Sequence, residues 1–346
     1  MRKLHYGEAI REAIQNEMEL DPNIILFGLD VTDHKGILGT TLNLVDKFGK
    51  ERCFSTPLSE DAMTGFALGA AISGLKPIHV HTRADFLVLA ANQIINMVSS
   101  FKYMVGGKTT IPLLIRAIIG RGWGQSFHHS KSLFSLFGHI PGLTVIAPTT
   151  PKDAKGMITA ALRSNKPVIC YEHRWLYYID DEVPVSDYEV PLGEPSIMKE
   201  GEDITILSTS WMNVEALRAA SILEKHDIDV EVIDARTISP LNYELIEKSV
   251  KKTGRFIVAD HDWIPFGFSS EASANIYHKC FKQLAIPIER IGYAFTPCPT
   301  TRPLENIFYP NSTTIVRTIE KMFTIKEIDL SNEVYYSYEN KFKGPF

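Results

Sequence analysis

The sequence has few cysteines and no long apolar run, and each shortage excludes a class of protein. Its four cysteines are scattered along the chain without a CxxC pair, so neither a zinc site nor a disulfide framework is expected. No apolar run reaches about 18 residues, the length that a membrane-spanning helix requires. The formal net charge is −5 and no block of like charge stands out, so nucleic acid has no electrostatic attraction to this chain. Small molecules and other proteins are the expected partners.

The N-terminal segment also lacks the features of an export signal. It reads MRKLHYGEAIREAIQNEM, an amphipathic helical pattern that contains acidic residues. A secretory signal has an apolar centre, and a transit peptide is poor in acids. Because the scattered cysteines also fit a reducing compartment, we expect a cytoplasmic protein.

A nucleotide-binding glycine motif is missing as well. The stretch Gly120–Gly124 reads GRGWG, which departs from the GxGxxG spacing of dinucleotide folds. The acidic residue that such folds place after the next strand is also missing. The sequence therefore argues against a dinucleotide site.

The length and the alternation of segments predict two α/β domains. At 346 residues, the chain is longer than the roughly 250 residues at which a single core stops growing. In the first half, short apolar strands alternate with helical segments, which is typical of a parallel, doubly wound sheet. The expected strands are residues 23–27, 77–80, 111–116, 143–147 and 168–172, and the main expected helices are residues 61–74, 86–103 and 151–163.

The alternation is interrupted by the acidic, proline-bearing residues 173–201 and then returns. Further strands are expected at residues 204–208, 230–234, 255–260 and 288–291, with helices at 213–225 and 241–251. We therefore predict the α/β class with two doubly wound domains, at residues 1–188, with a linker from about 173, and at residues 189–330. Residues 331–346 are polar and aromatic without a helical period, and are interpreted as an appended tail.

One predicted helix has unusual features. It follows the segment TPLSE, in which Thr56 or Ser59 can cap the helix and Glu60 lies at its positive end. Gly65 and Gly69 make the helix thin on one side. Because glycine lowers helix stability, its presence indicates that another backbone or a ligand approaches closely.

Five segments in order resemble the β subunits of pyruvate and branched-chain 2-oxo acid dehydrogenases. They are TPLSE at 56–60, GLKP at 74–77, HHSKS at 128–132, HIPGLTVIAP at 139–148 and VEVIDARTISPL at 230–241. The resemblance extends over roughly residues 4–323. Transketolases are similar more distantly, and the resemblance implies the same two domains, a thiamine-diphosphate pyrimidine-binding domain followed by a transketolase C-terminal-type domain.

The resemblance implies thiamine diphosphate as the cofactor and Glu60 as a catalytic residue. The thiazolium C2 of this cofactor is a very weak acid that must lose a proton to become a nucleophile. A carboxyl group that hydrogen-bonds N1′ of the aminopyrimidine favours the imino tautomer, whose 4′-nitrogen takes that proton. Without the resemblance, Glu60 would be interpreted only as an acid that favours the helix dipole.

The resemblance assigns three more cofactor contacts and a second catalytic residue. Phe86 stands where the family places a ring against the aminopyrimidine, although a ring at a helix start is more often part of the core. Leu58 and Thr82 match positions that border the pyrimidine pocket. His129 matches the active-site histidine of the β chain, near the acyl group and the lipoyl thiol; taken alone, His128 and His129 would be surface histidines or a fragment of a metal site.

The sequence also implies that the site needs a second chain. It has no Gly-Asp-Gly followed some 25–30 residues later by Asn, the pattern that holds the diphosphate through Mg²⁺ in this superfamily. The resemblance therefore implies an α subunit that holds Mg²⁺, in an α₂β₂ assembly that passes acyl groups to a lipoyl acyltransferase, E2. Alone, the chain is expected to form an inactive homodimer.

Two departures from the family pattern concern charged positions. The family commonly has acids where this chain has Leu29 and Asn92, and those acids form a channel between paired sites. The turn Ser164–Pro167 replaces an Asp-containing turn that binds K⁺ in relatives. By resemblance, Ala161, Ser164 and Lys166 form a loop for a monovalent cation, although the ammonium of Lys166 is an alternative to the ion.

Three functions fit these features. The first is the E1 β subunit, which decarboxylates a 2-oxo acid and transfers the acyl group to lipoamide. The second is a split transketolase-like or acyloin-forming enzyme that uses the same cofactor without lipoamide; the unusual HVHTRAD at residues 79–85 favours it. The third is a cofactor-free structural subunit, against which Glu60, Phe86 and His129 argue.

Overall fold

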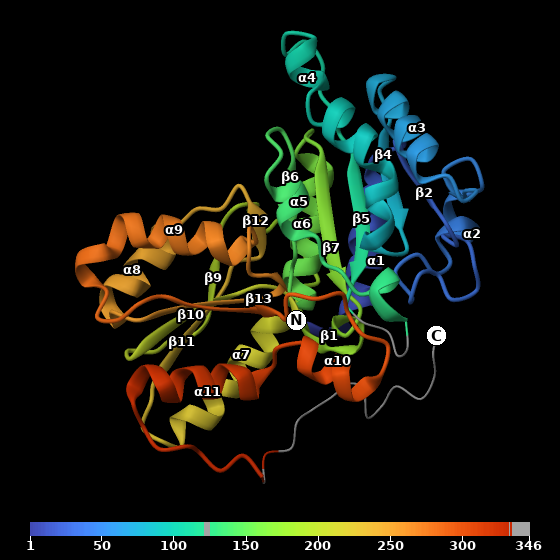
Figure 1. The fold of residues 1–346 in the computed structure, drawn as a ribbon. Coiled ribbons are helices and arrows are strands. Elements are labelled where there is room, and N and C mark those ends of the chain that lie inside the picture. The colour runs from blue at the N-terminus through green and yellow to red at the C-terminus, as the bar shows by residue number, and fades with distance from the viewer. Residues whose placement is uncertain (121–124, 332, 334–346) are drawn as a thin grey trace. The chain divides into compact units, whose positions relative to one another are not determined.

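The chain forms two compact units in the computed structural model, which describes residues 1–120, 125–331 and 333 (Figure 1). The first unit comprises Met1–Ile119, Ser132–Gly193 and Thr237–Pro240; the second comprises Gly120–Lys131, Glu194–Arg236 and Leu241–Phe346, as far as these are described. Residues 125–131 thus belong to the second unit, although strands of the first unit flank them in sequence. Most of the predicted tail, and of the glycine-rich stretch that begins at Gly120, lies outside the described residues.

The first unit contains a seven-stranded sheet with the order β12-β6-β7-β5-β4-β2-β3. All neighbouring strands are parallel except β12, which is antiparallel to β6. The doubly wound class predicted for this half is confirmed. The strands are β2 (Ile24–Gly28), β3 (Cys53–Ser55), β4 (Lys76–His81), β5 (Leu114–Ile119), β6 (Thr144–Ile146), β7 (Val168–His173) and β12 (Thr237–Ser239).

Helices flank this sheet (Figure 1), and their sequences explain where they begin. Helix α6 (Pro151–Arg163) has proline in its first turn, and the side chain of Thr150 accepts a hydrogen bond from the N–H of Asp153. Both features favour a helix start. The other α-helices described in this unit are α1 (Tyr6–Leu20), α2 (Leu44–Phe48), α3 (Glu60–Ile72), α4 (Phe101–Met104) and α5 (Phe134–Gly138).

The predicted continuous helix over residues 86–103 is wrong. The chain instead forms a 3₁₀ helix, η1 (Ala84–Ala90), a π-helix, η2 (Asn92–Val98), and then α4. Ser99 donates its N–H to Ile94 and its hydroxyl to Ile95, so it interrupts α-helical pairing where η2 ends. Among the described residues no single helix is long and apolar enough to cross a bilayer; the bent pair Ala84–Ala90 and Asn92–Met104 meets only the length and composition criteria.

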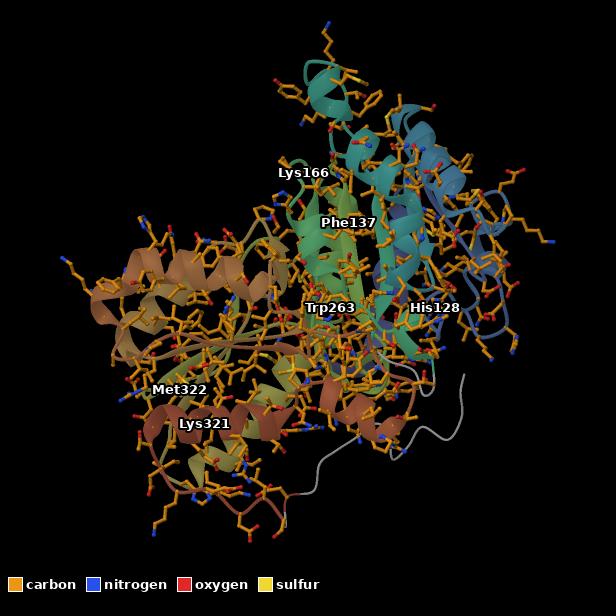
Figure 2. The ribbon with its side chains drawn as sticks, viewed as in Figure 1. His128, Phe137, Lys166, Trp263, Lys321 and Met322 are labelled. Atoms are coloured by element: carbon orange, nitrogen blue, oxygen red, sulfur yellow. The ribbon has the colours of Figure 1, made fainter. Side chains whose placement is uncertain are left out.

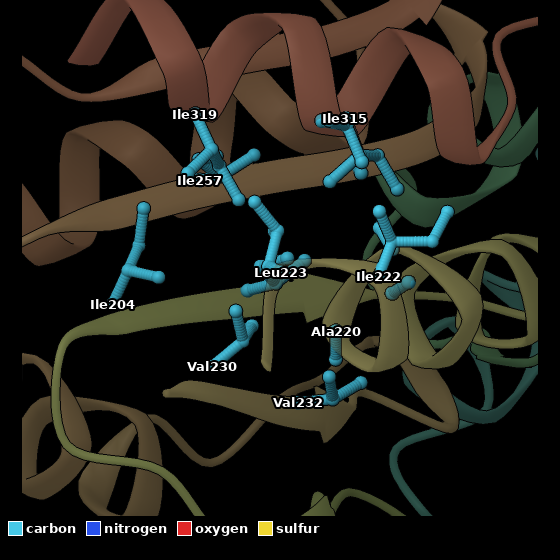
Figure 3. Packing of buried hydrophobic residues seen from close by; sticks show 14 of the residues in the cluster. Ile204, Ala220, Ile222, Leu223, Val230, Val232, Ile257, Ile315 and Ile319 are labelled. Carbon is cyan, nitrogen blue, oxygen red and sulfur yellow. The ribbon is translucent and has the colours of Figure 1, made fainter. Parts of the chain in front are cut away.

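The second unit contains a five-stranded sheet with the order β14-β13-β10-β11-β9, in which the edge strand β9 is antiparallel. Its strands are β9 (Ser196–Lys199), β10 (Ile204–Ser208), β11 (Val230–Asp234), β13 (Phe256–Trp263) and β14 (Glu289–Tyr293). Its α-helices are α7 (Trp211–Glu224), α8 (Glu244–Thr253), α9 (Phe268–Cys280), α10 (Arg302–Phe308) and α11 (Ser312–Phe323). Ile204, Leu223, Ile257 and Ile319 meet in its apolar core (Figure 3).

Residues 173–201 contain structure that the linker prediction missed. Strand β8 (Asp180–Val183) pairs antiparallel with β1 (Arg2–His5), and β9 forms an edge of the second sheet. The sequence of β8, DDEV, has no alternation of apolar and polar residues. Its pairing with β1 is set by tertiary structure, which local pattern does not report.

Candidate active site

A hollow opens where strands β2 and β4 of the first unit end and helix α3 begins. In parallel α/β sheets, ligands bind at the carboxyl ends of the strands. The predicted residues Leu58, Glu60, Thr82 and Phe86 all line this hollow, so the structure brings together four side chains that are up to 28 positions apart in sequence. The full lining is Leu29, Thr56, Pro57, Leu58, Ser59, Glu60, Met63, His79, Val80, His81, Thr82 and Phe86.

Glu60 is the first residue of α3, and its position follows from the helix start. Ser59 is the N-cap residue with φ −159°, and its side chain makes no capping hydrogen bond. Glu60 and Asp61 lie in the first turn, where unpaired N–H groups and the helix dipole favour negative charge. Asp61 accepts a hydrogen bond from Gln93 at 3.3 Å, whereas the half-buried Glu60 borders the hollow. The carboxylate is therefore available to a ligand.

Large apolar side chains are exposed on the elements that form the hollow. Leu58 is 74% exposed, Leu89 60%, Val88 49% and Phe66 47%. They come from the loop before α3, from η1 and from α3 itself. Large apolar side chains exposed on neighbouring elements are typical of interaction sites. We refer to Leu58, Phe66, Val88 and Leu89 as the apolar collar.

The two glycines of helix α3, Gly65 and Gly69, do not lie against another backbone within the described chain. A Cβ atom placed on Gly69 would meet nothing within 4 Å, and one on Gly65 would meet only the side chain of Gln93, at 3.5 Å. The close approach expected from these two glycines is therefore not made by any backbone among the described residues. The space beside Gly69 is open, whereas Gly65 faces the side chain of Gln93.

Two buried histidines, His79 and His81, form part of the hollow and were not predicted as site residues. They are 3% and 4% exposed, their ring centroids are 4.2 Å apart, and the ring of Phe27 stacks on His79 at 4.9 Å. Burial lowers the pKa of His81 to about 4, and burial together with repulsion from His81 lowers the pKa of His79 well below its usual value. Both rings are neutral at pH 7. The alternation His-Val-His, which turns both side chains to one face of a strand, was the available signal.

His129 lies elsewhere, in the second unit. It ends the 3₁₀ turn η3 (Ser126–His129) and is half-buried. Its neighbour His128 is exposed and contacts the ring of Phe127, with centroids 4.0 Å apart (Figure 2). The structure thus gathers Leu58, Glu60, Thr82 and Phe86 in one unit and describes His129 within the other.

The loop proposed for a monovalent cation is closed by its own hydrogen bonds. The carbonyl of Ala161 accepts from the N–H of Ser164 at 3.2 Å and from its hydroxyl at 2.8 Å. Lys166 donates its N–H to the Ser164 hydroxyl at 3.3 Å, and its side chain is exposed (Figure 2). In the part of the chain that the structure describes, no group of three or more His, Cys, Asp or Glu side chains is placed to hold a metal ion.

The sequence matches two protein-family descriptions in tandem. Residues 2–179 match "Transketolase, pyrimidine binding domain" and residues 193–315 match "Transketolase, C-terminal domain". The candidate hollow lies entirely within the first match.

Known proteins resemble the chain over almost its full length. The β subunit of acetoin:2,6-dichlorophenolindophenol oxidoreductase from Cupriavidus necator is 39% identical over 92% of this chain and 97% of the relative. The β subunit of 2-oxoisovalerate dehydrogenase from Bacillus subtilis is 36% identical over 90% of this chain and 96% of its own. A solved structure described as a split-gene transketolase, inactive β4 tetramer, aligns with a TM-score of 0.75 over 94% of this chain and 99% of that chain. At 21% identity, that likeness supports the fold alone.

Proposed function

Because this chain belongs to the family of β subunits of thiamine-diphosphate-dependent 2-oxo acid dehydrogenases, we propose that it is such a subunit and acts with an α-type partner. The observation that carries the proposal is the convergence of Glu60, Phe86, Leu58 and Thr82 on one hollow at the carboxyl ends of parallel strands. Their order and spacing resemble those of the family. The reaction proposed is oxidative decarboxylation of a 2-oxo acid with acyl transfer to lipoamide.

The residues of the hollow fit the aminopyrimidine half of thiamine diphosphate. The cofactor supplies a carbon nucleophile that adds to the substrate carbonyl. Glu60, a half-buried carboxylate at a helix start, would hydrogen-bond N1′ and hold a proton there. The half-buried ring of Phe86 offers a flat apolar face, and Leu58 and Thr82 border the same space. One carboxylate beside apolar side chains such as Phe86 and Leu58 suits a flat heteroaromatic ring.

An α-type subunit would complete the site and hold the diphosphate and Mg²⁺. The apolar collar and the open space at Gly69 support this part of the proposal, because the elements that form the hollow leave apolar side chains and helix surface uncovered. Interfaces that persist are apolar at their centre, where aromatic and methionine side chains are enriched. The proposed assembly is α₂β₂, with a homodimer when the chain is alone.

Three further assignments rest on resemblance or composition alone. His129 is proposed to act at acyl transfer to a lipoyl acyltransferase. K⁺ is proposed at the loop of Ala161, Ser164 and Lys166, with the Lys166 ammonium as the alternative. A cytoplasmic location is proposed from the cysteine usage and the N-terminal sequence.

A second candidate function is acyloin chemistry without lipoamide. It is favoured by one observation, the name of the Cupriavidus necator relative, which pairs acetoin with the dye 2,6-dichlorophenolindophenol. Both candidates use the same cofactor and the same carboxylate. They differ in the carbonyl substrate and in the acceptor.

The experiment that tests the proposal compares the complex and the isolated chain. Thiamine diphosphate with Mg²⁺ is titrated into each, and turnover is followed with 2-oxo acids or acetoin and with a lipoyl domain or a dye. We expect tight binding and turnover only in the complex, because a single charged hydrogen bond and one stack give about 2–4 kcal/mol before ordering costs, which corresponds to millimolar or weaker affinity. Micromolar binding and turnover by the isolated chain would contradict the proposal that it carries only half of the cofactor site. Turnover of acetoin with the dye but never with the lipoyl domain would select the second candidate.

A further inference from the structure

The turn that carries His129 is held by a buried hydrogen bond from a tyrosine far along the chain. The hydroxyl of Tyr309 donates to the carbonyl oxygen of Ser130 at 2.9 Å. Tyr309 is 4% exposed and Ser130 is fully buried. Both residues belong to the second unit. Because Ser130 directly follows His129, the fixed carbonyl is one residue from the imidazole-bearing backbone.

The turn has its own internal bonds, which fix its shape. The hydroxyl of Ser130 donates to the carbonyl of Ser126, and the ammonium of Lys131 donates to the carbonyl of Phe127 at 2.7 Å. Ser126 has φ +58°. Such local bonds close a short turn but do not place it on the domain. The bond from Tyr309 ties the turn to the body of the second unit.

The phenol ring of Tyr309 is itself held on three sides. Its centroid lies 4.9 Å from that of Tyr293, 5.1 Å from Phe308 and 5.3 Å from His261, with interplanar angles of 75° to 77°. The backbone N–H of Tyr309 donates a hydrogen bond to the carbonyl of Glu305 at 3.0 Å, at the end of α10. Edge-to-face contacts of this kind favour one ring orientation. The hydroxyl is therefore presented from a rigid support.

We propose that Tyr309 is a positioning residue for His129, and this rests on the proposed role of His129 in acyl transfer. Tyr309 acts through the Ser130 carbonyl, which it holds so that His129 keeps one orientation. A supporting residue of this type keeps a reacting group within the narrow range of geometries that catalysis needs. The hydroxyl of Tyr309, and not its ring, orients His129.

Tyr309→Phe in the complex with the α-type subunit tests the proposal, since it removes the hydroxyl and keeps the ring. We expect kcat for acyl transfer to a lipoyl domain to fall about tenfold or more, because small misplacements of a catalytic group are costly. The KM for the lipoyl domain and the decarboxylation rate with a dye should stay within about twofold of the original, because neither depends on the orientation of His129. Hydrogen–deuterium exchange should quicken at the amides of residues 126–131. With 4-aminophenylalanine at position 309, the amine donates in place of the hydroxyl. The kcat for acyl transfer and the amide exchange of residues 126–131 should then return toward the original values.

Tyr6→Phe is the matched control. Tyr6 is fully buried and donates its hydroxyl to the carbonyl of Pro148 at 3.0 Å, within the first unit. We expect both variants to lower the melting temperature by similar amounts, whereas only Tyr309→Phe changes acyl transfer. Unchanged exchange and transfer in Tyr309→Phe, or equal transfer losses in the two variants, would overturn the proposal. If the original complex acylates no lipoyl domain, the proposed function fails, and the exchange data on residues 126–131 still decide whether Tyr309 positions the turn.

Discussion

Helices α3 and α11 are similar in length and both rich in apolar residues, but they use those residues differently. In α11, Ile315, Val316 and Ile319 are fully buried against the core of the second unit. In α3, Phe66 and Ile72 are 47% and 40% exposed. Helix α11 therefore stabilises its own unit, whereas α3 keeps apolar surface beside Glu60 that its own unit does not cover. Apolar composition predicts a helix in both cases, but only the structure shows which one offers a surface to a partner.

The inner sides of the two helices differ as well. The inner side of α11 packs into an apolar cluster that includes Leu223 and Ile257. Under α3, the ring of Phe66 meets Phe27 at 5.2 Å, and Phe27 stacks on His79. His79 and His81 lie on β4, and both line the candidate hollow. Burial of polar rings is less favourable for stability than burial of apolar side chains.

The largest effect is expected from Glu60→Gln, which separates the function of α3 from its stability. Turnover in the complex should fall about a thousandfold or more, because the amide cannot exchange a proton with N1′. Asp61→Asn is the control, since it removes the neighbouring carboxylate of the same helix turn but not the one that lines the hollow. Exchange of the C2 proton of bound cofactor is the measurement. If the C2 proton exchanges as fast in Glu60→Gln as in the original complex, Glu60 does not have the proposed role.

Ile319→Ala should give the largest change in stability. Ile319 is fully buried, and removing such a side chain costs about 2–5 kcal/mol. Ile72→Ala on α3 removes the same atoms from a side chain that is 40% exposed, so its cost should stay below about 1 kcal/mol. Denaturant unfolding of the isolated chain checks both. Equal losses would show that α3 is packed as α11 is.

Leu89→Ser tests the collar. Leu89 is 60% exposed, so the isolated chain should keep its stability, while association with the α-type subunit should weaken about tenfold through loss of apolar contact. Leu20→Ser, at the end of α1, is the control, because Leu20 is also exposed, at 70%, but lies outside the collar. The two dissociation constants can be compared by sedimentation or light scattering. Equal association of the two variants would count against the collar as the interface.

The comparison of α3 with α11 also shows which features a sequence can predict. Strands 204–208 and 230–234 were predicted at their observed bounds because short segments rich in Ile and Val, bounded by turns, have few alternatives. The start of α6 at Pro151 follows from local chemistry. The 3₁₀ and π pairing over residues 84–98, in place of α-helical pairing, and the pairing of β8 with β1 depend on tertiary contacts and were missed.

The site follows the same division. The resemblance selected Leu58, Glu60, Thr82 and Phe86, which the structure gathers around one hollow. Their roles toward the cofactor stay predictions. The burial of His79 and His81 could not be predicted, because the His-Val-His pattern fixes their common face but not what covers it. The grouping of the His129 turn with the second unit depends equally on contacts between distant residues.

The smallest effect concerns the pH dependence that the buried His81 of β4 confers on stability. In the unfolded chain His81 has the ordinary histidine pKa of about 6.5, and in the folded chain its pKa is about 4. Between these values the unfolded chain binds more protons, so stability is complete above about pH 6.5 and decreases as the pH falls toward 4, by about 1 kcal/mol per pH unit. His81→Leu should flatten this part of the curve, and His278→Leu, at the end of α9 in the second unit, is the control. Denaturant unfolding at pH 7, 6 and 5 measures the free energy of unfolding of each variant. If it changes with pH in the same way in the original chain and in His81→Leu, His81 is charged or solvated in the folded chain.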